Sequence, residues 1–141
     1  MLKQGYFWKQ EGGYFCNFFN YQYGASIKQV FNDNVIIKKT YQAISEYGNQ
    51  IWPCTEITTQ MLNQSGTPQT SDLQLYDFNT LESNYHATFK GDTNYGSTKY
   101  NGKKLKGNYI IIKFEIAQAP NFVFLNAVTV RWINSPLTVT K

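Results

Sequence analysis

The last third of the chain carries the pattern that most constrains its fold. In the segment NYIIIKFEI, residues 108–116, apolar side chains recur at every second position, at Ile110, Ile112, Phe114 and Ile116. A period of two is the period of a β-strand that buries one of its faces. We therefore expect a half-buried strand here.

A second run with the same period follows after AQAPN. In FVFLNAVTVRWI, residues 122–133, one face carries Phe122, Phe124, Val128, Val130 and Trp132, interrupted by Asn126. Two strands joined by a short Pro-containing turn predict a β-hairpin. The residues that we expect to be buried are Ile110, Ile112, Phe114, Ile116, Val128 and Val130.

The upstream sequence predicts further short strands. Residues 25–33 and 34–44 are β-prone, and Asn32, Asp33 and Asn34 between them favour a turn, so a second hairpin is expected. Residues 12–24 and 84–90 are also β-prone. Many short strands separated by turns predict an all-β fold, an antiparallel β-sandwich or partly open barrel with little or no helix.

Two segments are expected to lie outside the strands. Residues 63–72, NQSGTPQTSD, are rich in turn-forming residues and predict a surface loop. Residues 55–66 are compatible with one short turn of helix. The length of 141 residues suits a single domain, residues 1–141, either alone or as part of a longer protein.

Composition excludes several classes of protein. Aromatic residues make up 17% of the chain and charged residues only 16%, which is opposite to the composition of disordered chains. The net charge of +4 is modest and spread out, so nucleic-acid binding is not expected. No apolar run reaches the roughly 18 residues of a membrane span, and MLKQGYFWKQEGG lacks the apolar segment of a signal peptide. We expect a soluble protein made in a reducing cytoplasm.

The residues that carry most enzyme chemistry are sparse. Cys16 and Cys54 form no Cys-x-x-Cys pattern and are expected to be buried thiols. His86 is the only histidine and has no nucleophile pattern beside it, and the acidic residues form no metal-ligand cluster. No catalytic residue, metal site or cofactor is expected.

Residues 89–116 combine a polar turn, six lysines, four of them between residues 99 and 106, and the clearest strand. Asp92, Asn94 and Gly96 are spaced like the first half of a calcium loop, but the second half is missing. A phosphate-binding loop is also absent, because no Gly-x-x-x-x-Gly-Lys-Ser/Thr run precedes a helix. We interpret the stretch as a connector whose lysines form a solvated loop or contact an acidic partner. These lysines are Lys99, Lys103, Lys104 and Lys106.

The aromatic side chains leave two functions open. Rings with polar edges are typical of protein interfaces and of sugar-stacking platforms. Besides the four lysines, the candidate interface residues lie near the N-terminus, at Tyr6, Phe7, Trp8, Tyr14, Tyr21 and Tyr23. The candidate sugar-stacking residues are the three tryptophans, Trp8, Trp52 and Trp132.

Three segments, taken in order, carry a resemblance. They are FFNYQYGASIKQVFNDNVIIKKTYQAI, YHATFKGDTNYGSTKYNGKKLKGNYIIIKFEI and FVFLNAVTVRWINS. The succession resembles the C-terminal β-domain of tail muzzle or tail-stabilisation proteins of crAss-like and related Bacteroidales phages. The resemblance covers strand and turn patterns and no catalytic residues, and it suggests Gly107 and Asn32 to Asn34 as turn positions.

The resemblance implies a structural, non-catalytic domain of a phage tail. Its partners would be copies of itself and other tail proteins, in a virion made in the cytoplasm of the bacterial host. The alternative is a carbohydrate-binding β-sandwich at the host-contact surface. An enzyme is the least favoured of the three.

Overall fold

The computed structural model describes residues 24–62, 66–92, 103–116 and 123–135, together with the backbone of four short strands near the N-terminus. These strands form two antiparallel pairs. The first pair is β1 (Leu2–Lys3) with β2 (Tyr6–Phe7), and the second is β3 (Asn17–Phe18) with β4 (Tyr21–Gln22).

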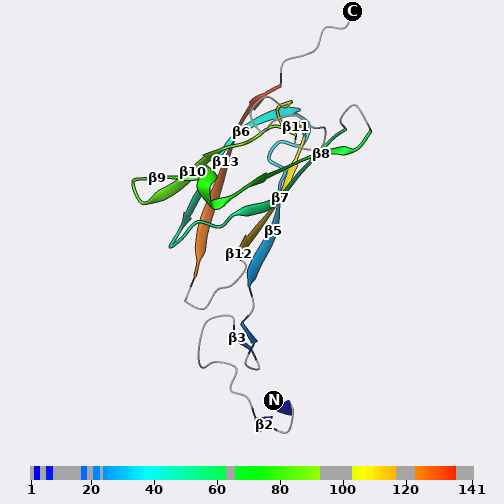
Figure 1. The fold of residues 1–141 in the computed structure, drawn as a ribbon. Helices are drawn as coiled ribbons and strands as arrows, with labels where there is room; N and C mark the ends of the chain where they lie inside the picture. Colours follow the sequence, from blue (N-terminus) through cyan, green and yellow to red (C-terminus); the bar gives the residue numbers. More distant parts are fainter. Residues whose placement is uncertain are drawn as a thin grey trace, which may run out of the picture.

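The body of the molecule consists of two antiparallel sheets that pack face to face (Figure 1). The first sheet has the strand order β5-β12-β7-β8. Its strands are β5 (Ala25–Phe31), β7 (Cys54–Leu62), β8 (Pro68–Leu73) and β12 (Ile110–Ile116). In this sheet β12 and β7 are central, while β5 and β8 are the edges.

The second sheet is built around β6 (Lys39–Gly48), which pairs with three other strands. These are β10 (Asn84–Thr88), β11 (Lys106–Gly107) and β13 (Leu125–Asn134). β9 (Asn79–Leu81) adds to β10 at the far edge, after a single turn of 3-10 helix, η1 (Leu75–Asp77). The predicted antiparallel β-sandwich is confirmed.

β12 forms the strand that its alternation predicts. Ile110, Ile112, Phe114 and Ile116 are all buried, and the residues between them are half-buried. Val128 and Val130 on β13 are only half-buried, although they pack against the core. The difference follows from position, because β12 has a neighbour on both sides and β13 is an edge strand.

Both predicted hairpins are wrong. β5 pairs with β12 and not with β6, and β12 and β13 belong to different sheets. The turn after β5 is real, since Asn34 adopts a positive φ of 50°. A turn reverses the chain, but it does not determine whether the next strand returns beside the last one or crosses to the opposite sheet.

Strands also occupy parts of the two segments that were expected to form a turn of helix and a surface loop. Residues 54–62 form β7 and residues 68–73 form β8, and the two strands pair with each other. Gln69 is buried within this polar segment, and both polar atoms of its amide have partners: its Oε1 accepts from Thr59 Oγ1 (3.1 Å) and from Lys106 N (2.9 Å). Its Nε2 donates to Lys104 O (3.2 Å). Polar side chains with hydrogen-bond partners thus allow a sequence rich in turn-forming residues to be partly buried.

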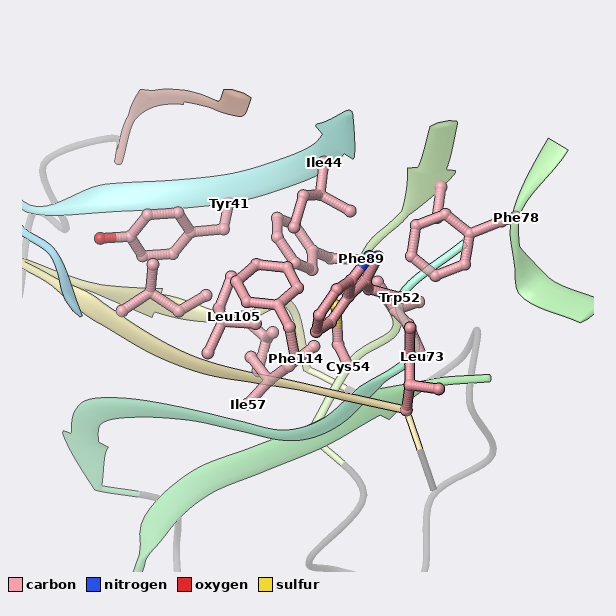
Figure 2. Close-up of a cluster of buried hydrophobic side chains, with 14 of the residues drawn as sticks. Tyr41, Ile44, Trp52, Cys54, Ile57, Leu73, Phe78, Phe89, Leu105 and Phe114 are labelled. Atoms are coloured by element: carbon pink, nitrogen blue, oxygen red, sulfur yellow. The ribbon is translucent and has the colours of Figure 1, made fainter. Parts of the chain in front are cut away.

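The core fills the space between the sheets (Figure 2). Trp52, Phe78, Phe89 and Phe114 contribute rings, and Tyr41 packs edge-to-face against Phe89 at 6.5 Å between centroids. Cys54 is a buried free thiol as expected, whereas Cys16 lies outside the described residues.

Candidate functional site

One side of the sandwich presents two edge strands, β5 and β13. Among the described strands, β5 pairs only with β12, and β13 pairs only with β6. Most β5 side chains are exposed, and Ile27 and Val30 are 42% and 46% exposed. On β13, Ile133 is 48% exposed. Sequence analysis missed this edge, because the alternation of a strand gives no information about its neighbours in the sheet.

A cavity of about 400 Å³ opens at this edge between the two sheets. Its lining comes from β5, the turn after it, β6 and β13: Val30, Phe31, Asn32, Asp33, Lys39, Tyr41, Val130 and Trp132. The cavity therefore joins apolar walls to a group of polar side chains.

Lys39, at the start of β6, is a buried cation in the cavity wall. Its Nζ donates to Asn34 O (3.0 Å) and to Asn108 O (2.6 Å) and lies 5.1 Å from the centre of the Trp132 ring. Burial lowers the pKa of Lys39, and the nearby Asp33 opposes that shift. The two carbonyls and the ring take the place of the water that an ammonium group normally keeps.

Tyr41, two residues further along β6, is only 3% exposed. Figure 2 shows its hydroxyl pointing away from the rings of Phe89 and Phe114. The hydroxyl has no hydrogen-bond partner among the described residues. Burial raises its pKa to about 12, so that the group keeps its proton at neutral pH.

The three candidate sugar-stacking tryptophans differ in position. Trp52 is 4% exposed within the core, and its Nε1 donates to Phe124 O (3.3 Å), so the expectation of a stacking platform there is corrected. The spacing of aromatic residues does not distinguish a core ring from a surface ring. Trp132 is half-buried and lines the edge cavity, beside Asn32 and Asp33. Trp8 lies outside the described residues.

The lysine-rich connector is described only in part. Lys103 and Lys104 are exposed, Lys106 is half-buried on β11, and Lys99 lies outside the described residues. Asp92 is buried, and its Oδ1 accepts from Thr70 N (3.1 Å). This carboxylate joins β8 to the connector. Gly107, suggested as a turn position, is a strand residue of β11 instead.

The aromatic interface candidates lie among residues 6–23, where the structure describes the backbone of short strands and no side chains. Tyr6, Phe7 and Tyr21 belong to the short paired strands, of which only the backbone is described. Trp8, Tyr14 and Tyr23 lie outside the described residues. The exposed apolar residues that the structure does describe lie elsewhere, on β5, the turn after it, η1, β9 and β13.

His86 has a serine beside it that the sequence did not reveal. Ser45 Oγ and His86 Nδ1 are 2.7 Å apart, on facing positions of β6 and β10. Ser45 alternates with the buried Ile44 and Glu46, so the pair lies on the outer face of the sheet and not in the edge cavity. A serine nucleophile also needs donors for an oxyanion and a concave site for substrate. The cavity that the structure shows is lined by neither residue of this pair.

Glu46 is a second buried ionisable group on β6. Its Oε1 accepts from Trp52 N (2.8 Å), and Cys54 Sγ lies 3.9 Å from Oε2. Burial raises the pKa of this carboxyl to about 7, although the two hydrogen bonds act in the opposite direction. The described residues contain no group of three or more histidine, cysteine, aspartate or glutamate side chains arranged to hold a metal ion.

The opposite side of the sandwich has a different character. Near β9, Leu75, Tyr76 and Leu81 are exposed. Beneath them, Lys90 and Asp77 form a buried ion pair with 2.5 Å between Nζ and Oδ2.

No helix in the described part of the chain is long and apolar enough to cross a membrane.

No protein-family model matches the chain, and no curated protein sequence matches it significantly.

Proposed function

We propose that this domain is a structural, non-catalytic component of a phage tail that packs against copies of itself and other tail proteins. The observation that carries the proposal is the β5 edge, an exposed strand with apolar side chains that no described strand covers. The assembly is proposed to be a phage tail because residues 18–44, 85–116 and 122–135 resemble tail muzzle domains.

β5 is the better of the two edges for pairing with another chain. Its seven residues pair with β12 without any shift in register, so its outer side is a regular row of backbone donors and acceptors. The ladder between β13 and β6 shifts twice, near Leu125 and near Arg131. Bulges of this kind hinder the addition of a further strand.

Exposed regular edges are normally protected in proteins that stay monomeric. β5 carries one such protective charge, Lys28, which is partly neutralised by Glu56 at 3.4 Å. Ile27 beside it faces the buried Phe114 across the ladder and extends the apolar interior to the surface. A second strand added to β5 would bury this side chain and satisfy the row of backbone groups.

The test is sedimentation velocity over a range of protein concentrations. We expect wild-type protein to associate reversibly, and Ile27→Lys to shift the association to concentrations roughly tenfold higher or more, because it places like charges at the contact. Leu81→Lys, at an exposed position on the opposite edge, is the matched control and should associate like wild type. A protein that stays monomeric throughout, or equal effects of the two variants, would contradict the proposal.

A further inference from the structure

The edge cavity has the composition of a ligand site. One part of its wall is apolar, from Val30, Phe31 and Val130, and Trp132 adds a half-buried ring. The other part holds Asp33, Lys39 and the Tyr41 hydroxyl. We infer that this cavity binds one neutral pyranose ring of a saccharide, independently of the assembly role.

The Tyr41 hydroxyl is the first reason to expect a ligand. Burial of a hydroxyl without a partner is unfavourable, and such groups are rare in native proteins. The polar side-chain atoms of Lys39 and Gln69, which are also buried, each have a hydrogen-bond partner within the protein. The Tyr41 hydroxyl, by contrast, has no partner among the described residues, and Tyr41 lines the cavity.

The charges select the class of ligand. Asp33 and Lys39 carry opposite charges on one wall, so neither an anion nor a cation finds a uniformly favourable field. The Lys39 ammonium has three N–H groups and uses two of them on the carbonyls of Asn34 and Asn108. Hydroxyl groups, which both donate and accept, match this mixture of a carboxylate, an amide, a phenol and an ammonium.

The apolar wall and the size narrow the class further. A pyranose has a face of C–H groups that packs on aromatic and aliphatic side chains, and here Trp132 lies opposite Val30 and Phe31 on the other sheet. Lys39 makes a cation–π contact with the Trp132 ring. A cavity of about 400 Å³ is at the small end of the range for ligand sites and suits one sugar ring better than a long chain.

The test uses saturation-transfer NMR on the full chain. The probes are the methyl α-glycosides of glucose, galactose, mannose and N-acetylglucosamine, with the methyl glycoside of glucuronic acid as the anionic comparison. We expect saturation transfer to the ring protons of at least one neutral probe. Tyr41→Phe should weaken its binding roughly two- to tenfold, the effect of one neutral hydrogen bond. Trp132→Ala should abolish the signal.

Two controls keep the test decisive. Tyr76→Phe removes the hydroxyl of an exposed tyrosine at the opposite edge and should bind like wild type. Thermal unfolding should show that Tyr41→Phe is folded, because it removes only an oxygen atom. Absence of transfer from all four neutral probes, binding of the glucuronide alone, or equal binding by wild type and Tyr41→Phe would each overturn the inference. Sedimentation of the same variants reports on assembly separately.

Discussion

The central strands of the two sheets, β12 and β6, solve the same packing problem with different side chains. The inner face of β12 is entirely apolar, from Ile110 to Ile116. The inner side of β6 buries Lys39, Tyr41 and Glu46 along with Ile44. Burial of a polar group is unfavourable unless its hydrogen bonds are made inside the protein. β12 therefore serves mainly to hold the sandwich together, whereas β6 also contributes side chains to a site.

The partners on β6 come from segments distant in sequence. Lys39 is bound by the turn after β5 and by Asn108, and Glu46 by the backbone of Trp52. Tyr41 receives no such partner among the described residues. We accordingly expect substitutions on β12 to affect stability most, and substitutions along β6 to have smaller effects that depend on pH or on a ligand.

The largest effect is expected for Ile112→Ala. Ile112 is fully buried at the centre of β12, so the variant loses apolar contacts and leaves a cavity. Its free energy of unfolding should fall by about 2–5 kcal/mol in chemical denaturation. Ile111→Ala, on the half-buried opposite face, should be clearly milder. Equal losses in the two variants would contradict the assignment of faces.

A smaller loss is expected for Lys39→Met. The methionine fills similar space but leaves the carbonyl groups of Asn34 and Asn108 without their donor. We expect the free energy of unfolding to decrease by about 1–3 kcal/mol. Lys103→Met, at an exposed lysine, should stay within about 0.5 kcal/mol of wild type. If Lys39→Met were instead more stable than wild type, the buried ammonium would be a net burden on the fold.

Glu46 makes the stability of β6 depend on pH. Burial raises its pKa from 4.5 to about 7, so between these values the folded protein keeps a proton that the unfolded chain has lost. Its contribution to stability is therefore complete below about pH 4.5, declines as the pH rises to about 7, and is lost above.

The variant Glu46→Gln removes this titration while keeping an acceptor for Trp52 N. At pH 8 it should be more stable than wild type by on the order of 1 kcal/mol, and the difference should shrink toward pH 5. Denaturation curves at several pH values measure it. A difference that grows toward low pH would show that the carboxyl is ionised in the fold.

The smallest effect on stability is expected for Tyr41→Phe. Because the hydroxyl has no partner among the described residues, its removal should leave the free energy of unfolding within about 0.5 kcal/mol of wild type or raise it slightly. A loss of 1 kcal/mol or more in thermal or chemical unfolding would mean that the hydroxyl is already well paired, and would remove one support of the cavity inference.

The sequence predicts β12 far better than β6. The alternation at residues 110–116 predicts the buried face of β12, because the side chains that avoid water can be read directly from the sequence. The all-β class follows in the same way. The pairing partners of each strand cannot be predicted in this way. β5 and β13 lie at edges only because of pairings across the whole chain. The buried Lys39, and the hydroxyl of Tyr41 at a cavity, are likewise invisible without the fold. The residue type alone makes Trp132 a candidate for stacking on a sugar, and only the fold places it in the wall of the edge cavity.

Amide hydrogen exchange tests most directly the claim that the β5 edge is the contact surface. Exchange of the protein should be compared at concentrations where sedimentation shows it dispersed and associated. We predict that association slows exchange in residues 25–31 beyond all other described strands, while residues 79–81 on the opposite edge are unchanged. Slower exchange at β9, or no change at β5 in associated protein, would contradict the account.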